Sequence, residues 1–288
     1  MRNLDENTIT QAVIERNEKI QDDRLRHVMA SLVQHLHTFA RDVQLTEKEW
    51  EKGIEFLTAV GQICTPTRQE FILLSDTLGL STLVTAQNHK KPENCTEATV
   101  FGPFHVADVP MVDLGADISN GMKGVPFYVK GTVRGVDGEP IPNATIEAWH
   151  ADEDGFYDVQ DPNLIGCKGR AVMQADSNGA YHFKTIMPEC YPIPHDGPVG
   201  KMLEAFKRHP WRPAHLHFML SAPGYERLVT HIFREGSNYL ESDAVFGVRS
   251  SLVCDWVHHE SGVTPYGEQT GKPFVTTEYN FILNREKN

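Results

Sequence analysis

Hydrophobic residues near the start of the chain recur at the spacing of an amphipathic helix. Their intervals lie near three, four and seven residues, which places them along one face of a helix. The positions of this stripe are Ile9, Val13, Ile20, Leu25, Val28, Leu32, Leu36 and Phe39. We expect one long first helix, whose apolar stripe packs against a partner subunit or against the rest of the chain.

Start and stop signals mark further helices before residue 100. Thr46-Glu47-Lys48-Glu49 has the form of a capping box, with Thr46 as N-cap and Glu49 reaching back to it. The helix that begins there is expected to turn four apolar residues inward, Trp50, Ile54, Leu57 and Val60. A second helix should run from about residue 67 to Leu78 and end at Gly79, followed by a short one over residues 81–87.

After Pro103 the pattern changes to short strands separated by Gly, Pro and Asp turns. The expected strands span residues 127–133, 144–149, 169–175, 181–183, 214–221, 228–233 and 278–283. The turn Asp176-Ser177-Asn178-Gly179 predicts that the third and fourth of them form a hairpin. Many short strands without alternating helices favour an antiparallel β-sandwich.

The fold class predicted from these patterns is α+β. An N-terminal helical domain over residues 1–105 is expected to pack on a C-terminal antiparallel β-sandwich catalytic domain over residues 106–288. The boundary is a change of period without a low-complexity linker, so the two parts should pack as one unit.

Composition narrows the class of protein. The 288 residues include 27 Lys and Arg against 39 Asp and Glu, a formal charge of −12, which argues against a nucleic-acid partner. No stretch is apolar enough to span a bilayer and the first residues lack an apolar signal segment, so we expect a cytoplasmic protein that is not a membrane protein. The five cysteines are scattered, which favours reduced thiols over a disulfide framework or a zinc ribbon.

The segment Arg212-Pro213-Ala214-His215-Leu216-His217-Phe218 offers a metal site. Residues i and i+2 of a strand point to the same face, so His215 and His217 can present two imidazoles to one ion. The chain has 14 histidines, however, and chance pairs of this kind are common. A satisfied structural pair is the alternative to a metal site.

Two sets of additional ligands are compatible with this histidine pair. Asp152-Glu153-Asp154 could add a carboxylate and complete an iron(II) site of two histidines and one carboxylate. Two loop tyrosines offer another set, Tyr157 after the turn Asp154-Gly155-Phe156 and Tyr191 at the start of the proline-stiffened Tyr191-Pro192-Ile193-Pro194. Either tyrosine taken alone is more often a packed ring with a hydrogen-bonded hydroxyl.

The order and spacing of these motifs resemble those of the intradiol ring-cleaving dioxygenases. The resemblance rests on Asp154-Gly155-Phe156-Tyr157, on Tyr191-Pro192-Ile193-Pro194 and on residues 212–218, and it continues through Ser221-Ala222-Pro223-Gly224-Tyr225. It extends to the helical half of the chain. Within the family, residues 97–104 and 241–248 resemble the branch that cleaves hydroxyquinol, 1,2,4-trihydroxybenzene.

The resemblance implies one ferric ion per chain, held by Tyr157, Tyr191, His215 and His217, and no organic cofactor. Phenolates are hard anionic donors that suit a trivalent ion, and a bound cation lowers the pKa of a phenol from about 10. Two residues are implied to be catalytic: the axial ligand Tyr191 takes up a substrate proton, and Arg212 stabilises negative charge on the ring. The implied reaction cleaves hydroxyquinol with O2 to 3-hydroxy-cis,cis-muconate or maleylacetate.

A set of substrate-binding residues also follows from the resemblance. It comprises Leu73, Asp76, Val100, Phe101, Gly102, Phe104, His231 and Val245. Apolar walls with one carboxylate suit a flat ring that carries an extra hydroxyl, for which Asp76 is the expected partner. Asp76 could equally tie down its own helix. His231 stands where relatives that cleave catechol carry a glutamine, and packing on its strand is the alternative to a role beside the iron.

Rival functions stay open at this level. A catechol or chlorocatechol 1,2-dioxygenase giving cis,cis-muconate is the alternative within the family, and a non-catalytic β-sandwich binding module is the alternative from another class. The expected partners are a small aromatic diol or triol and O2. The resemblance also implies a homodimer formed through the N-terminal helices, in some relatives with a phospholipid held between the subunits.

Overall fold

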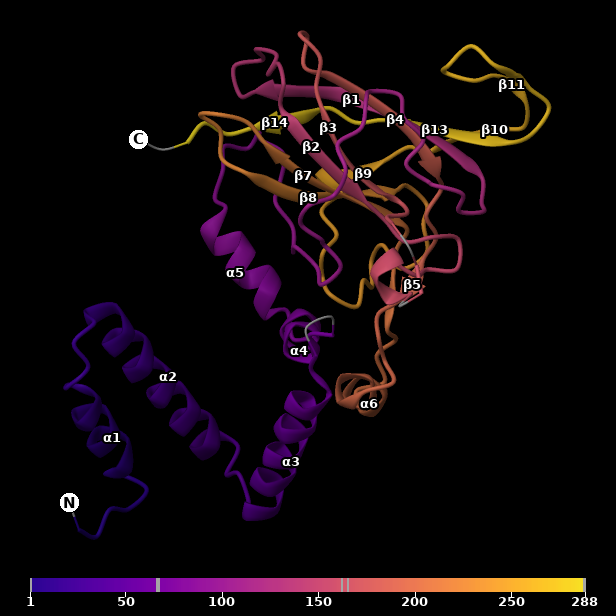
Figure 1. Cartoon of the computed structure of the whole chain (residues 1–288). Helices are drawn as coiled ribbons and strands as arrows, with labels where there is room; N and C mark the ends of the chain where they lie inside the picture. The colour runs from indigo at the N-terminus through magenta and orange to yellow at the C-terminus, as the bar shows by residue number, and fades with distance from the viewer. Residues whose placement is uncertain (1, 66–67, 162, 165, 287–288) are drawn as a thin grey trace. The chain divides into compact units, whose positions relative to one another are not determined.

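Ten strands of this computed structural model form two five-stranded sheets, which lie against each other in Figure 1. The structure describes residues 2–65, 68–161, 163–164 and 166–286. The chain divides into two compact units, Met1–Ala59 and Val60–Asn288, and both sheets belong to the second. The change of sequence pattern near residue 105 therefore does not coincide with the place where the compact units part.

The first sheet is built around the long strand β1 (Pro126–Gly135). It pairs antiparallel with β4 (Ala180–Ile186) and parallel with β13 (Phe274–Glu278) and β14 (Phe281–Leu283). The short strand β10 (Val257–His259) pairs antiparallel with β13. Because one central strand has both parallel and antiparallel partners, this sheet is mixed.

The second sheet has the order β3-β2-β7-β8-β9 and carries the predicted His-x-His segment on its central strand. Its strands are β3 (Arg170–Gln174), β2 (Thr145–Trp149), β7 (His215–Ser221), β8 (Leu228–Arg234) and β9 (Val253–Cys254). All neighbours are antiparallel except β8 and β9. The two-part α+β fold class is confirmed, but the strictly antiparallel sandwich is corrected to a mixed one.

The core lies between the two sheets. Phe127 and Phe183 project from the first sheet, and Ile146 and Phe218 from the second, all with side chains fully removed from solvent. Burial of large apolar side chains at about 25 cal/mol per Å² is the main favourable term that holds two sheets together. The histidines of the site described below lie on a strand of this packed sandwich.

The predicted hairpin is wrong, although its turn is present. Asp176 accepts hydrogen bonds from the backbone N–H groups of Asn178 and Ala180, as in the expected tight turn. The strands on either side nevertheless enter different sheets, since β3 pairs with β2 and β4 pairs with β1. Turn residues specify a local reversal of the chain, and the choice of pairing partner is made by contacts distant in sequence.

Shorter elements lie between the strands of the two sheets. They are β5 (Tyr191–Pro192), β6 (Trp211–Arg212), β11 (Gly262–Val263), β12 (Gln269–Thr270), α6 (Pro198–Ala205), and the 3-10 turns η1 (Asp158–Gln160) and η2 (Ser250–Leu252). β5 pairs with β6, and β11 with β12. The helix α6 was not predicted, although Pro198 at its first position is a recognised start signal.

Two helices of the second unit precede the strands. α4 (Glu70–Thr77) ends before Gly79, which has the left-handed φ of 75° expected of a helix terminator, and α5 (Leu80–Asn88) follows it. The predicted start of α4 near residue 67 lies outside the described residues. Glu70 connects α4 to α6, because its carboxylate accepts a hydrogen bond from the Val199 N–H at 3.1 Å.

The helices at the N-terminus differ from the prediction in two respects. The expected single helix is two, α1 (Ile9–Asn17) and α2 (Asp23–Asp42), because Asp22 caps a new helix by accepting a hydrogen bond from the Leu25 N–H. α3 (Glu47–Ile63) begins at the predicted capping box, in which Thr46 and Glu49 bond each other's backbone N–H. No helix within the described ranges is long and apolar enough to cross a membrane.

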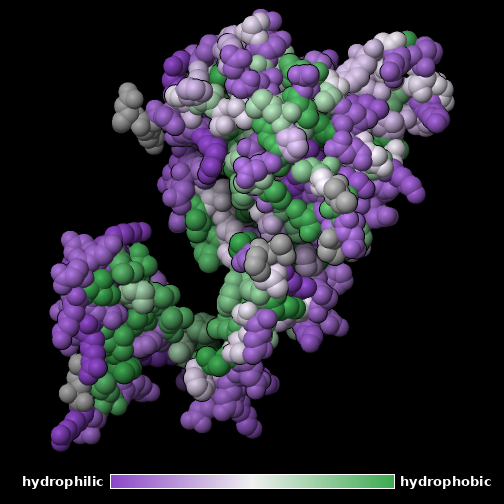
Figure 2. All heavy atoms as spheres, in the orientation of Figure 1, coloured by the Kyte–Doolittle hydropathy of each residue, from purple (hydrophilic) through white to green (hydrophobic). Residues whose placement is uncertain are grey.

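The predicted inward face of α3 is buried only at its end. Val60 is buried, whereas Trp50, Ile54 and Leu57 are exposed. The stripe of α2 is exposed too, and Figure 2 shows hydrophobic residues gathered along these helices. An amphipathic period identifies the face that a helix can bury, and it does not say against what.

Candidate metal centre

Strand β7 presents His215 and His217 on one face of the second sheet, as the sequence predicted. The strand neighbours directly opposite His217 are Trp149 of β2 and His231 of β8, so the three side chains form one row across the sheet. The Trp149 ring stacks on His217 with 4.8 Å between ring centroids and an interplanar angle of 15°. All of these side chains are buried, which excludes water from this end of the sheet.

The two loop tyrosines reach the same place from other elements. Tyr157 ends the turn after β2 and caps η1, while Tyr191 lies on β5, paired in register with Arg212 of β6. Gly155 allows the loops to approach, because a Cβ on it would lie 2.4 Å from the Cβ of Tyr191. Its φ of 85° is also a conformation that favours glycine.

The four predicted ligands converge on the hydroxyl of Tyr157. It lies 2.9 Å from His217 Nε2, 3.3 Å from the Tyr191 hydroxyl and 3.5 Å from His215 Nε2. The two Nε2 atoms are 3.2 Å apart. The side chains are exposed by 1% for Tyr157, 4% for Tyr191 and 2% for each histidine, so the donors face one another without solvent.

Protonation states favour a cation at this point. His215 Nδ1 lies 2.7 Å from the Pro213 carbonyl and must carry its proton, which leaves a lone pair on Nε2. Burial lowers the pKa of both His215 and His217 well below the usual value, so both imidazoles are neutral. Burial and the neighbouring Tyr191 raise the pKa of Tyr157, and a bound cation is the ordinary means of ionising such a phenol. The donor set fits a trivalent metal ion.

His231 is a third histidine at the cluster. Its ring nitrogen lies near those of His215 and His217, all within 4.8 Å of one another. Its Nδ1 is hydrogen-bonded to the Thr99 hydroxyl, and its Nε2 is buried without a partner among the described residues. The interpretation of His231 as a residue that only packs on its strand leaves this nitrogen unexplained.

No carboxylate of the described residues belongs to this cluster. The Asp152 carboxylate, part of the segment considered for an iron(II) site, instead accepts hydrogen bonds from the N–H groups of Asp154 and Phe156. It therefore shapes the turn that carries Tyr157. The tyrosines are the set of additional ligands that the geometry supports.

Arg212 places a permanent positive charge beside the cluster. Its Nη1 lies 3.3 Å from His215 Nε2, and the side chain is buried. Burial opposes the charge, but the Asp243 carboxylate and the nearby tyrosines raise the pKa of Arg212 above its usual value. A guanidinium fixed in a dry site interacts strongly with negative charge that develops nearby.

Four of the predicted substrate residues lie around the cluster or an adjoining cavity. Phe104 stacks on the Tyr157 ring at 4.4 Å, and a Cβ on Gly102 would lie 3.3 Å from His217 Cε1. A cavity of about 620 Å³ is lined by Leu73 and Phe104, together with loop residues on either side of the tyrosines. Buried His231 is the fourth.

The other predicted substrate residues are less directly connected. Asp76 on α4 is buried, and burial raises the pKa of its carboxyl, although Ser81 and Arg212 act in the opposite direction. Val245 is buried beside Gly247, next to the Arg212–Asp243 pair. Phe101 is 41% exposed and packs on His105, and Val100 is buried.

Comparison with known proteins identifies the chain's relatives. Residues 101–285 match a family model described as "Dioxygenase", and residues 22–96 match one described as "Catechol dioxygenase N terminus". The chain belongs to the intradiol dioxygenases. As a member of an enzyme family, the chain is not a non-catalytic binding module.

Individual relatives point to one branch of the family. The 6-chlorohydroxyquinol 1,2-dioxygenase of Cupriavidus pinatubonensis is 57% identical over 99% of both chains. The hydroxyquinol 1,2-dioxygenase of Corynebacterium glutamicum is 50% identical over 96% of this chain and 93% of its own. The crystal structure of the hydroxyquinol 1,2-dioxygenase from Pseudomonas putida is 44% identical, with a TM-score of 0.90 over 98% of this chain and 99% of that one.

Three residues of the site were not predicted: Trp149, Thr99 and Asp243. Trp149 contacts His217 across paired strands, and Thr99 contacts His231 from the irregular segment after α5. A pattern along one strand reveals neither contact. Asp243 lies inside the segment 241–248 that carries part of the family resemblance. The resemblance of that segment could have drawn attention to Asp243, but the sequence does not show that Asp243 forms an ion pair with Arg212.

Proposed function

We propose that this enzyme uses one ferric ion per chain, held by Tyr157, Tyr191, His215 and His217, to cleave hydroxyquinol between adjacent hydroxyl groups. The observation that supports the ligand set is the approach of three donor atoms to within 2.9–3.5 Å of the Tyr157 hydroxyl. Two phenolates and two neutral imidazoles suit iron(III), and no organic cofactor is part of the proposal. When bound, the ion supplies a Lewis-acidic centre that acidifies the hydroxyls of an aromatic diol and promotes their reaction with O2.

Tyr191 and Arg212 have the catalytic roles in this proposal. The Tyr191 oxygen accepts a proton from a substrate hydroxyl, which leaves the ring as an electron-rich anion. Arg212 holds its positive charge beside that anion and stabilises the negative charge that grows on the ring as oxygen attacks. Phe104 and Trp149 cover the donor atoms with apolar surface and keep water away from them.

The third hydroxyl of hydroxyquinol is assigned to Asp76. Its carboxyl is buried near Arg212 with a raised pKa, and a buried polar group of this kind is stabilised by a hydrogen-bonding partner. Leu73 and Phe104 line the cavity through which a flat ring would enter, and Val100, Phe101, Gly102, His231 and Val245 complete the proposed binding set. The names of the most similar relatives agree with hydroxyquinol as substrate.

Oxygen uptake by the iron-loaded enzyme tests the substrate. We expect kcat/KM to be at least about tenfold higher for hydroxyquinol than for catechol or 3-chlorocatechol, and the product to be 3-hydroxy-cis,cis-muconate, isolated as maleylacetate. A higher kcat/KM for catechol than for hydroxyquinol would show that the enzyme is a catechol 1,2-dioxygenase instead. In Asp76→Asn the preference for hydroxyquinol should fall, while kcat/KM for catechol stays within about twofold. Equal losses for both substrates would contradict the role of Asp76.

We also propose that the exposed stripe of α2 and α3 is the surface of a homodimer. Large apolar side chains such as Leu32 on α2 (47% exposed) and Trp50 on α3 (56%) are unusual on a free surface when several of them follow one face of a helix. A phospholipid between the subunits is part of the same proposal, and mass spectrometry of an organic extract tests it. The cytoplasmic location stays a prediction.

A further inference from the structure

The Arg212 guanidinium is held by one carboxylate, that of Asp243. The Arg212 Nε lies 3.0 Å from Asp243 Oδ1, and its Nη2 lies 3.4 Å from Oδ2. Both side chains are nearly inaccessible, with 4% of Arg212 and 2% of Asp243 exposed. Asp243 is the only carboxylate that forms a salt bridge with Arg212 among the described residues. The pairing leaves Nη1 as the group directed at His215.

The same carboxylate also organises the loop on which it lies. Oδ2 accepts a hydrogen bond from the Gly247 N–H at 2.8 Å, and Oδ1 accepts one from the Val245 N–H at 3.4 Å. The next residue, Ala244, donates its N–H to the Trp211 carbonyl of β6 at 3.1 Å. Asp243 therefore joins the strand that carries Arg212 to the loop that carries Val245.

Space around the pair is too small for Arg212 to adopt other positions freely. A Cβ on Gly247 would lie 3.0 Å from Arg212 Nη2 and 3.1 Å from Asp243 Oδ2. A guanidinium is planar and carries its donors in a fixed fork, so bonds at Nε and Nη2 also fix the direction of Nη1. A buried ion pair contributes little net stability, whereas the direction of a catalytic charge affects the rate strongly.

We propose that Asp243 is a positioning residue for the ring-cleavage reaction. It orients Arg212 toward the developing charge on the substrate and, through its loop bonds, fixes Val245 in the wall of the substrate site. The inference rests on the proposed function of Arg212 and adds the residue that holds its guanidinium in the required direction. Asp243 itself does not touch the reacting atoms.

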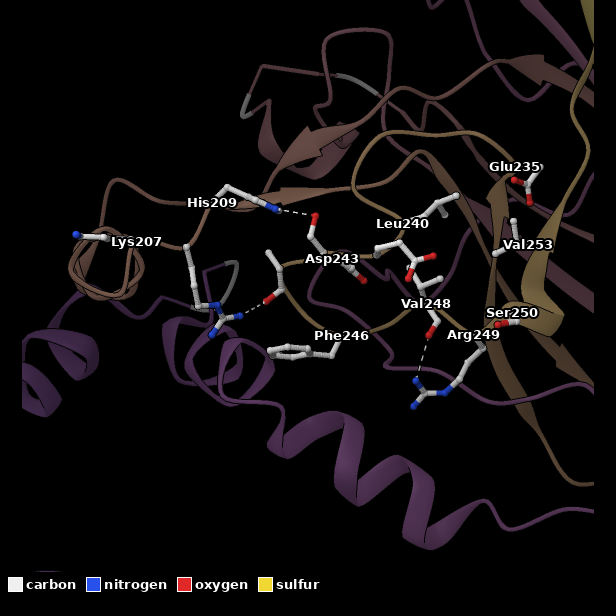
Figure 3. Close-up of a pocket in the computed structure, with 14 residues that line it drawn as sticks. Lys207, His209, Glu235, Leu240, Asp243, Phe246, Val248, Arg249, Ser250 and Val253 are labelled. Carbon is white, nitrogen blue, oxygen red and sulfur yellow. Dashed lines mark hydrogen bonds between the residues drawn. The ribbon is translucent and has the colours of Figure 1, made fainter. Parts of the chain in front are cut away.

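The outer side of the loop provides a matched control. Asp243 lies on the wall of a cavity of about 720 Å³, with Phe246, Val248 and His209 around it (Figure 3). Ser242, the neighbour of Asp243, bonds His209 Nε2 at 2.9 Å on this outer side. Ser242→Ala removes one tie of the same loop without touching Arg212.

The test compares Asp243→Asn with Ser242→Ala in the iron-loaded enzyme. We expect Asp243→Asn to lower kcat for hydroxyquinol about 100-fold, with KM changed less than about threefold and with iron content and the visible absorption band retained. Ser242→Ala should stay within about twofold of the wild type. A second variant, Gly247→Ala, places a methyl group against the Arg212–Asp243 ion pair without removing a charge. We expect its kcat to fall about tenfold.

A double-mutant cycle separates positioning from a structural role. Arg212→Gln should lower kcat strongly in the wild type but much less in the Asp243→Asn background, because the arginine there is already misplaced. Additive losses, wild-type kcat in Asp243→Asn, or a loss of kcat that only follows a loss of iron would overturn the inference. If the wild type itself does not cleave hydroxyquinol or catechol, the proposed function fails instead.

Discussion

The strands and the N-terminal helices of this protein bury their functional surfaces to very different degrees. Around the metal centre Tyr157 is 1% exposed and His217 2%, whereas on α2 Leu32 is 47% and Leu36 56% exposed. The donor atoms are held by a β-sandwich whose core is formed within one chain. In the proposed account, one chain supplies all four iron ligands, whereas the exposed helical stripe is the surface assigned to a second subunit.

Among the changes to the site on the strands, replacing a proposed tyrosine ligand should lower the activity most. Tyr191→Phe removes both a proposed metal donor and the proposed proton acceptor, so kcat/KM for hydroxyquinol should fall by at least about 1,000-fold. The sedimentation coefficient should stay that of the wild type, because the helices are unchanged. The control is Tyr181→Phe, since the Tyr181 hydroxyl bonds the Tyr279 carbonyl away from the site. Equal losses in both variants would contradict the assignment of Tyr191.

Acid should destabilise the second compact unit (Val60–Asn288) because its buried His150 must take up a proton. Burial lowers the pKa of His150 to about 4 from 6.5, so the folded state takes up the proton less readily than the unfolded state. Its stabilising contribution is complete above pH 6.5 and is lost as the pH falls from 6.5 toward 4, a change of about 3 kcal/mol.

Urea unfolding at pH 7.5, 5.5 and 4.5 measures this contribution. His150→Gln has no proton to take up in either state, so the difference in unfolding free energy between wild type and variant should shrink with acid. Parallel curves for the two proteins would show that His150 does not carry the effect.

A charged residue in the exposed apolar stripe of α2 tests whether this stripe is the dimer surface. Leu32→Glu should weaken self-association at least about 100-fold, because a carboxylate would be buried at the proposed interface. Sedimentation velocity measures it, and oxygen uptake per bound iron should stay within about twofold. Gln34→Glu adds the same charge to the opposite face of α2 and should leave the assembly intact. A dimer that survives Leu32→Glu would place the interface elsewhere.

The smallest expected effect concerns the start of α3. Thr46→Ala removes half of the capping box and should cost about 1 kcal/mol of local helix stability. Faster hydrogen exchange at the amides of residues 48–50 reports this loss, with ring cleavage unchanged. Thr38→Ala, within α2 and outside any cap, is the control, and equal exchange in both variants would argue against the cap.

Local patterns predicted those parts of the fold and site that depend on neighbours in sequence. The Thr46–Glu49 box, the terminator Gly79 and the His215–His217 spacing all act within a few residues, and the structure has each of them. The split between α1 and α2 was also local, and the cap at Asp22 was overlooked.

Contacts between distant segments could not be predicted in this way. The turn at residues 176–179 leads into another sheet because β4 pairs with β1, and the row Trp149–His217–His231 depends on the register of three strands. The ion pair of Arg212 with Asp243 joins residues 31 positions apart. Single-sequence patterns do not specify which strand or loop will lie beside another.

The visible absorption spectrum of the purified, iron-loaded protein tests the central claim most directly. Tyrosinate bound to iron(III) absorbs visible light, so we predict a coloured protein with one iron per chain. Anaerobic addition of hydroxyquinol should shift the band as the substrate binds beside Tyr191. A colourless protein that retains no iron, or a band that hydroxyquinol leaves unchanged, would contradict the account.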